Sequence, residues 1–517
     1  MIYRNKAVLF ILFVFLFYLF FSYSVAYTKT TKYGGVAVFS FYDRMNSFDP
    51  ANCEDFNSLQ VCSGIFEGLV KFDPESNSII PALARKWMTS DYKTWTFFLQ
   101  KDIKFHDGTD FTSESVKFNF DRQLNNRINS NFSVYKNLFG KYGDYIVKIE
   151  TPERYKVRII LAQPDVLFLY KLAMPASAIP SQVALKKFGS EFPYHPVGTG
   201  PFYFSEWRRS GRIILNKNVR YNDSVYLDRI IFEPYTDIDY CVRQMLRGIT
   251  DISTGISIKD FEKKSLDSNF DSVNSPSESL FFLLLNPEKK EFKNASSRRA
   301  VSYLIDKKDL ANEYDGTEAY SFLTSSMLGY VKKNFSYNKD DINSFIASID
   351  SDRVFTLIYP EDNFFSFQYQ EGLAIKIQKY LRAGGVKVAL KKMPYNEYIS
   401  ALSNKNYDMA FWVERDIYGT PDIYLPLIYS VRVFRKMTGN SSNWVYDLDS
   451  LMLEARAEIN QNKRKIIYSS ADNLLFDNMP SVPLFYKKNA VVFSDRLDNV
   501  KYIPSGVIIL KSLWVKN

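Results

Sequence analysis

One glycine-rich segment has a composition that occurs in anion-binding loops: Gly198-Thr199-Gly200-Pro201. Glycine-rich loops that bind phosphate present consecutive backbone N–H groups at the start of a helix, often followed by Lys and then Ser or Thr. Pro201 has no N–H to donate, and residues 202–204 (Phe-Tyr-Phe) are typical of a strand rather than a helix. The sequence therefore favours a structural turn over a nucleotide site.

Side chains that could catalyse a reaction do not form a recognisable pattern. The sequence contains no serine-centred elbow, HExxH pair, paired-acid motif or Cys–His signature. Neither histidine offers a convincing base, because His106 lies between a strand and a turn and His195 directly precedes Pro196. We therefore expect a protein that is not an enzyme, with an unrecognised hydrolase as the alternative.

The chain has three cysteines, Cys53, Cys62 and Cys241. Their spacing, together with only two histidines, argues against a metal site. In an oxidising compartment they allow one disulfide and one remaining thiol. A Cys53–Cys62 bond would close a short loop, and pairing with Cys241 is equally compatible with the sequence. No metal and no cofactor is expected.

The N-terminus has the pattern of a secretory signal peptide. Arg4 and Lys6 precede an apolar run over residues 7–21, and Ser24-Val25-Ala26 supplies the small residues that signal peptidase reads. The run is shorter than the roughly 20 residues of a membrane-spanning helix. We expect cleavage after residue 26. No cysteine follows the run closely enough for a lipid anchor, which favours a periplasmic location.

The length of the chain indicates how many domains it has, and the distribution of charge argues against nucleic-acid binding. The 517 residues exceed one ordinary domain and predict two or three. The net charge of +9 arises from 66 basic and 57 acidic residues that are dispersed along the chain. No basic helix or zinc pattern accompanies them, so we expect no nucleic-acid partner.

Hydrophobic periodicity predicts an α/β protein with α+β parts. Residues 354–413 alternate strand and helix, which is typical of partly parallel pairing. The first half is richer in strands and includes a hairpin over residues 147–164. A stripe from Leu59 to Leu69 predicts a helix, and Asp306 is placed to cap another.

Four blocks of sequence resemble one protein family. They occur in order along nearly the whole mature chain, at residues 65–123, 196–221, 298–310 and 407–424. Together they resemble the bacterial extracellular solute-binding proteins of the dipeptide and oligopeptide type. The resemblance implies a bilobal periplasmic binding protein fold, in which hinge strands join two lobes and the ligand lies in the cleft between them. It also makes the glycine-rich turn the start of a strand in the larger lobe.

The resemblance also implies a domain division and a function. Lobe I would comprise residues 27–277 and 483–517, with an inserted subdomain at about 58–180, and lobe II residues 278–482. The protein would capture peptides in the periplasm, as a monomer, and deliver them to the membrane permease of an ABC importer. The alternative within this transporter class is a non-peptide ligand, such as a nickel chelate, haem, a sugar or an antimicrobial peptide.

Candidate binding residues follow from the fourth block. Relatives that bind peptides hold the ligand amine with an Asp in the pattern Trp-x-x-Asp, which here is one residue longer and ends at Asp416. Asp416 is therefore the candidate partner of the amine, Glu414 its competitor, and Trp412 a residue lining the pocket. Tyr418 of the same block is a further candidate. So is Asp55, because the loop around it should face the cleft.

An anchor for the ligand carboxylate is not evident. Some relatives carry an arginine in the segment equivalent to residues 359–370, and this chain has none there. That absence counts against a dipeptide specificity. The five aromatic residues of the segment suggest an apolar or longer ligand, or simply core packing: Tyr359, Phe364, Phe365, Phe367 and Tyr369.

Overall fold

The computed structural model describes residues 33–516, except for residues 43–44, 46, 54, 74, 77, 125–144, 236, 266–268, 334–336, 362–369, 417–418, 430–442 and 504. The expected signal peptide lies outside these residues. Within the described part of the chain, no helix combines the length and the apolar character needed to cross a bilayer.

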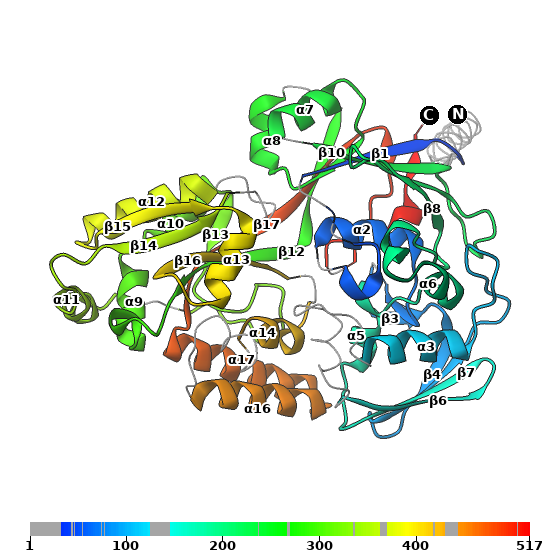
Figure 1. Ribbon diagram of the computed structural model, residues 1–517, viewed down its shortest axis with the longest axis horizontal. Helices are drawn as coiled ribbons and strands as arrows, with labels where there is room; N and C mark the ends of the chain where they lie inside the picture. Colours follow the sequence, from blue (N-terminus) through cyan, green and yellow to red (C-terminus); the bar gives the residue numbers. More distant parts are fainter. Residues whose placement is uncertain are drawn as a thin grey trace, which may run out of the picture.

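One mixed sheet of 11 strands runs through the whole molecule (Figure 1). β13 (Gly316–Glu318) pairs with β17 beside the main path. The strands of that path are, in order, β15 (Val388–Met393), β14 (Phe355–Pro360), β16 (Met409–Arg415), β12 (Phe270–Leu285), β17 (Ser481–Ser494), β11 (Ile252–Thr254), β1 (Val36–Tyr42), β10 (Arg229–Tyr235), β9 (Ile213–Lys217) and β8 (Phe202–Trp207).

Two long strands connect the two lobes that Figure 1 shows on its left and right sides. β12 and β17 pair in an antiparallel manner, and their register shifts between Asn274 and Glu278. Beyond the shift, β12 residues alternate between two apolar cores, with Leu280 in one and Phe281 in the other, as a two-sided buried strand requires. The predicted bilobal fold is confirmed.

The second lobe, on the left of Figure 1, contains the expected α/β region. β14 pairs in parallel with both β15 and β16, and α12 (Gln370–Ala383) and α13 (Tyr395–Ser403) provide the crossovers. The predicted cap at Asp306 is also correct, because its carboxylate accepts the Asp309 N–H at 2.9 Å at the start of α10 (Lys307–Glu313).

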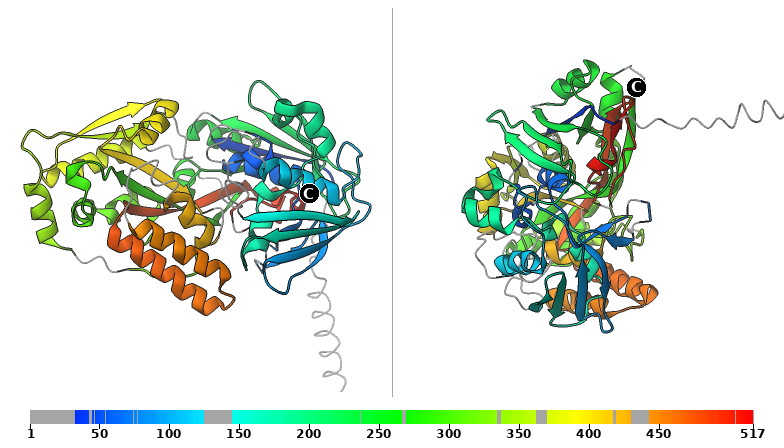
Figure 2. Two further views of the ribbon diagram at one scale, coloured as in Figure 1. Left: turned by 60° about the horizontal axis from the view of Figure 1, so that its bottom comes forward. Right: turned by 90° about the vertical axis from the view of Figure 1, so that its right-hand side faces the viewer.

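The first lobe carries a second, antiparallel sheet at its far end. Its strand order is β4 (Ala84–Met88), β5 (Thr94–Leu99), β7 (Lys156–Leu161) and β6 (Ile146–Glu153), and α3 (Ser113–Leu124) packs against β6 and β7. β6 and β7 form the predicted hairpin. Figure 2 shows this sheet lying across from the helices of the second lobe.

The glycine-rich turn packs against the backbone of another segment. The Gly200 N–H donates to the Ile65 carbonyl at 2.9 Å, and a Cβ on Gly198 would lie only 2.1 Å from that same oxygen. His106 fixes the turn from the other side, since its Nδ1 accepts from the Gly198 N–H at 3.3 Å and its Nε2 lies 3.0 Å from the Gly200 carbonyl. The turn is structural and leads directly into β8, as predicted.

One predicted helix is too long. The stripe from Leu59 to Leu69 suggested a continuous helix, but α2 (Phe56–Ile65) ends four residues earlier and Phe66 is extended. The Ile65 carbonyl is engaged by the glycine-rich turn, and Leu69 directly precedes β2 (Val70–Phe72). A tertiary contact therefore ends the helix where local periodicity would have continued it.

Candidate functional site

Three acidic side chains meet where β16 and β12 reach the boundary between the lobes. We call Glu278, Glu414 and Asp416 the carboxylate cluster. Trp412, Glu414 and Asp416 alternate along β16 and just beyond it, so they are directed to the same face of the sheet. The Trp412 indole donates to Glu414 Oε2 at 3.2 Å, and the Asp416 N–H donates to the Glu278 carbonyl at 2.8 Å.

Hydroxyl and backbone groups hold the Asp416 carboxylate. It accepts from Thr324 Oγ1 at 3.0 Å, Ser326 Oγ at 3.3 Å and the Gly419 N–H at 2.7 Å. Only 2 % of Asp416 is exposed. These donors orient the carboxylate at the lobe boundary, where it can receive a cationic group.

Glu278 is held in the same way by the neighbouring residue of that loop. Its Oε2 accepts from both the N–H and the hydroxyl of Ser325, at 2.9 and 2.8 Å. Burial raises the pKa of Glu414 to about 7, and the charge of Asp416 adds to that rise, while the bond from Trp412 opposes it. The cluster thus contains one carboxylate that changes charge near neutral pH.

A contact across the boundary joins this region to the first lobe. The Arg415 guanidinium lies 3.4 Å from the centre of the Phe56 ring, a cation–π arrangement, and burial lowers the pKa of Arg415 to about 9. Phe56 begins α2, whose N-cap is the neighbouring Asp55; its Oδ1 accepts the Ser58 N–H at 2.7 Å. Asp55 therefore has a structural role as a helix cap. It directly precedes Phe56, the residue that contacts Arg415 of the second lobe.

The structure thus brings four of the five predicted binding residues close to the lobe boundary: Trp412, Glu414, Asp416 and Asp55. Tyr418 lies outside the described residues. So does most of the segment in which a carboxylate anchor was sought, and Tyr359 of that segment is buried at the end of β14. The loop donors Thr324 and Ser326 were not anticipated, because only the fold places them beside Asp416.

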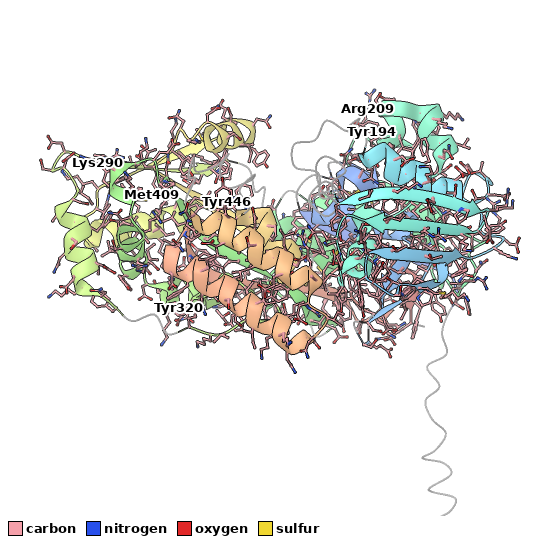
Figure 3. The ribbon with its side chains drawn as sticks, turned by 90° about the horizontal axis from the view of Figure 1, so that it is seen from below. Tyr194, Arg209, Lys290, Tyr320, Met409 and Tyr446 are labelled. Atoms are coloured by element: carbon pink, nitrogen blue, oxygen red, sulfur yellow. The ribbon has the colours of Figure 1, made fainter. Side chains whose placement is uncertain are left out.

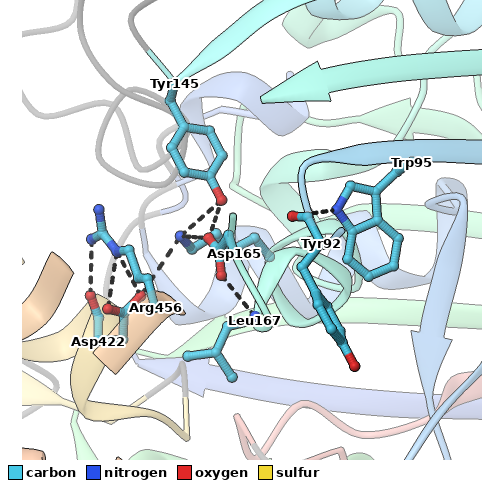
Figure 4. Close-up of polar contacts among 8 residues, drawn as sticks. Tyr92, Trp95, Tyr145, Asp165, Leu167, Asp422 and Arg456 are labelled. Carbon is cyan, nitrogen blue, oxygen red and sulfur yellow. Dashed lines mark hydrogen bonds and ion pairs between the residues drawn. The ribbon is translucent and has the colours of Figure 1, made fainter. Parts of the chain in front are cut away.

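A second set of buried charges lies where the antiparallel sheet of the first lobe touches the helices of the second (Figure 4). We call it the ion cluster. Lys171, in α5 (Phe168–Leu172), has its Nζ 2.5 Å from Asp165 Oδ2 and 3.6 Å from Asp422 Oδ2. Arg456 Nε lies 2.9 Å from Asp422 Oδ1. Asp422 belongs to α14 (Pro421–Tyr429) and Arg456 to α16 (Asn443–Ala457).

This contact also includes backbone and apolar groups. The Val166 N–H donates to the Arg456 carbonyl at 3.0 Å, and Ile423 packs into the core of the antiparallel sheet. Figure 3 shows α16 and its neighbour α17 (Gln461–Asn478) extending toward the first lobe. The side chains of Lys171, Asp165 and Asp422 are at most 1 % exposed. The two lobes are therefore in direct contact here.

Burial and charge pairing together shift the pKa values of three groups in and beside the ion cluster. Burial alone would raise the pKa of Asp165, but the charge of Lys171 and the hydrogen bonds it receives hold that pKa below its ordinary value. Burial raises the pKa of Tyr145, whose hydroxyl donates to Asp165. Asp422 keeps the pKa of Arg456 above its ordinary value despite burial.

Groupings of His, Cys, Asp and Glu suited to a metal ion do not occur among the residues that the structure describes. The site consists instead of carboxylates, hydroxyls and aromatic rings at a boundary between two lobes. That arrangement fits the binding of a solute between the lobes.

Comparisons with known proteins agree with this arrangement. The chain is 25% identical over 485 residues to the "Probable D,D-dipeptide-binding periplasmic protein DdpA" of Escherichia coli, covering 89% of this chain and 90% of that one. Its fold is similar to a periplasmic binding protein, DppA, from Helicobacter pylori in complex with the peptide STSA (TM-score 0.82, 23% identity, covering 94% of this chain and 99% of the other). It is also similar to a dipeptide-binding protein from Pseudoalteromonas in complex with Met-Leu (TM-score 0.83, 20% identity, 93% and 100% covered).

The sequence profile of one family covers most of the chain. Residues 78–434 match the family described as "Bacterial extracellular solute-binding proteins, family 5 Middle". This range includes the four-stranded sheet, all of β12, and β16 with the carboxylate cluster. The chain belongs to the family 5 bacterial extracellular solute-binding proteins.

Proposed function

We propose that this protein is exported to the periplasm and captures peptides for an ABC importer. The observation that carries the proposal is the buried Asp416 carboxylate, held by Thr324, Ser326 and Gly419 at the lobe boundary. A buried and oriented carboxylate at the lobe boundary suits the α-amine of a peptide. The peptide-binding names of the similar proteins support the same ligand class.

Capture would proceed by closure of the two lobes over the ligand. The register shift in β12, between Asn274 and Glu278, supplies a point where two long strands can bend. The boundaries proposed for the lobes place a division there, at residues 277 and 278. The ligand favours the closed state because it contacts both lobes at once only in that state. The ion cluster would close with them and so contribute to the affinity.

No catalytic step forms part of this proposal. The protein would act as a monomer that passes its ligand to permease subunits in the inner membrane. Removal of residues 1–26 would leave Tyr27 as the first residue. Intact-mass measurement on protein from the periplasm tests this, and a mass that retains residues 1–26 would contradict it.

The decisive experiment identifies the natural ligand. Protein purified from its own periplasm is denatured, and the released small molecules are analysed by mass spectrometry. Recovered peptides, followed by calorimetry with synthetic copies, would establish the ligand class and its length. A metal chelate, haem or sugar would contradict the peptide and retain the transport role. Catalytic turnover of a recovered ligand would instead favour the hydrolase alternative.

A further inference from the structure

Two of the three cysteines lie side by side in the first lobe. Cys53 directly follows the short helix η1 (Pro50–Asn52), and Cys62 lies in the second half of α2. Their sulfur atoms are 2.6 Å apart, and both residues are 1% exposed. A disulfide bond is about 2.05 Å long. The two side chains could therefore be joined with little movement of the backbone.

The third cysteine is placed elsewhere. Cys241, in α7 (Ile238–Leu246), has its sulfur 3.0 Å from Ser40 Oγ and 3.3 Å from Ser253 Oγ. It belongs to a separate apolar cluster from the one that contains Cys53 and Cys62. Of the pairings that the sequence leaves open, only Cys53 with Cys62 brings two sulfurs into contact.

We propose that Cys53 and Cys62 form a disulfide when the exported chain folds. This inference rests on the proposed export, because the oxidant it needs is a protein or small-molecule disulfide of an oxidising compartment. One cysteine thiolate attacks the oxidant's S–S bond, which forms a mixed disulfide and releases one thiol. The second thiolate displaces the remaining half. The pair loses two protons and two electrons, and the oxidant is reduced to two thiols.

Folding determines when this exchange can occur. Burial raises the pKa of both thiols, and the nearby Asp49 and Asp55 carboxylates add to that rise. Buried, protonated thiols react slowly, since the thiolate is the nucleophile. The bond therefore forms before the segment is covered, and it is then protected from reductants in the folded protein.

The position of the bond gives it a role in the binding region. It closes a loop that contains Asp55 and Phe56, and Phe56 receives Arg415 from the second lobe. Just before the loop, Asp49 is held by Arg122 of α3 through two hydrogen bonds of 2.7 and 2.9 Å. The disulfide thus fixes the segment of the first lobe that faces the second.

Counting free thiols tests the bond. Protein from the periplasm is denatured in N-ethylmaleimide, and its intact mass is measured with and without prior reduction. We expect one label, on Cys241, before reduction and three after it. Peptide mapping should join the fragments of Cys53 and Cys62. Three labels without reduction, or a link to Cys241, would overturn the proposal.

Two further measurements separate this inference from the proposed function. The chain refolded in oxidised and reduced glutathione should form the same link, whether or not the protein is exported in the cell, and no thiol count requires a ligand. The Cys53→Ser/Cys62→Ser variant should unfold about 5 °C lower than the wild type. Cys241→Ser provides the matched control. An equal midpoint for the double variant and the wild type would contradict the stabilising role.

Discussion

Buried charges occupy the boundary between the lobes at two places, and their partners differ. In the ion cluster, Asp165 and Asp422 face the cations Lys171 and Arg456. In the carboxylate cluster, Asp416 accepts hydrogen bonds from Thr324, Ser326 and Gly419 instead. In the first arrangement, carboxylates and cations pair with one another. In the second, hydroxyl and backbone donors orient a buried carboxylate.

This difference assigns different tasks to the two regions. A cluster whose charges pair across the boundary breaks when the lobes separate, so it favours the closed state. Removing a carboxylate from water costs free energy, and a cationic ligand can offset that cost. One region therefore holds the lobes together, and the other selects what they enclose.

Removing the charge of Lys171 from the ion cluster should have the largest effect on ligand binding. Lys171→Met leaves two buried carboxylates with one cation fewer, and a broken buried pair costs about 3–5 kcal/mol. We expect weaker ligand binding and a larger population of open molecules. Calorimetry and small-angle X-ray scattering with and without ligand measure the two effects.

A matched control uses a lysine in a surface pair. Lys117 and Asp121 form an exposed i,i+4 pair at 2.8 Å on α3, and such pairs contribute about 0.3–0.5 kcal/mol. Lys117→Met should therefore bind ligand like the wild type. If Lys171→Met also binds normally and scatters as a closed molecule, the ion cluster does not hold the lobes together.

Asp416→Ala tests whether the carboxylate cluster binds the amine of the ligand. Loss of one partner of a buried charge pair typically costs about 2–5 kcal/mol, so peptide affinity should fall by roughly 30-fold or more. Asp447→Ala, on the exposed surface of α16, is the control. Unchanged affinity in calorimetry would remove Asp416 from the site, provided that the variant retains its thermal midpoint.

Some features of these regions could be predicted from the sequence and others could not, for a physical reason. The glycine-rich turn, the Asp306 cap and the β14–β16 region were predictable because their signals lie within a few neighbouring residues. The Trp412–Asp416 segment was found through resemblance. The ion cluster was not anticipated, because Lys171 and Asp422 are far apart in the chain and meet only in the fold. The early end of α2 has the same origin, since the residues that engage Ile65 begin at Gly198.

The His106 ring is buried beside the glycine-rich turn, where both of its nitrogens contact backbone groups. Burial lowers its pKa from 6.5 to about 4, so the unfolded chain binds a proton at a higher pH than the folded one. This contribution to stability is complete above pH 6.5 and is lost as the pH falls toward 4, by about 3 kcal/mol. His106→Gln should remove that slope from chemical unfolding curves. His195→Gln, which alters a ring stacked on Phe188, should retain it, and an equal slope in both variants would contradict the assignment.

Glu414 gives the opposite dependence of stability on pH, with a pKa shift of similar size. Its pKa is raised from 4.5 to about 7, so the folded chain keeps a proton that the unfolded chain releases near pH 4.5. Stability therefore falls as the pH rises from 4.5 to 7, and Glu414→Gln should be more stable than the wild type at pH 8, by about 3 kcal/mol. Glu454→Gln, on the exposed face of α16, should show no such gain.

The same Glu414→Gln variant decides between the two carboxylates as partners of the ligand amine. If Asp416 alone receives the amine, the variant should bind peptide like the wild type at pH 8, where the Glu414 of the wild type is mostly ionised. If Glu414 shares the amine, affinity should fall in the variant, and wild-type affinity should fall as the pH drops below 7 because protonation removes the charge. Calorimetry at pH 6 and pH 8 distinguishes these cases. If peptide affinity falls with Glu414→Gln but not with Asp416→Ala, the partner of the ligand amine is Glu414, two residues earlier on the same face of the sheet.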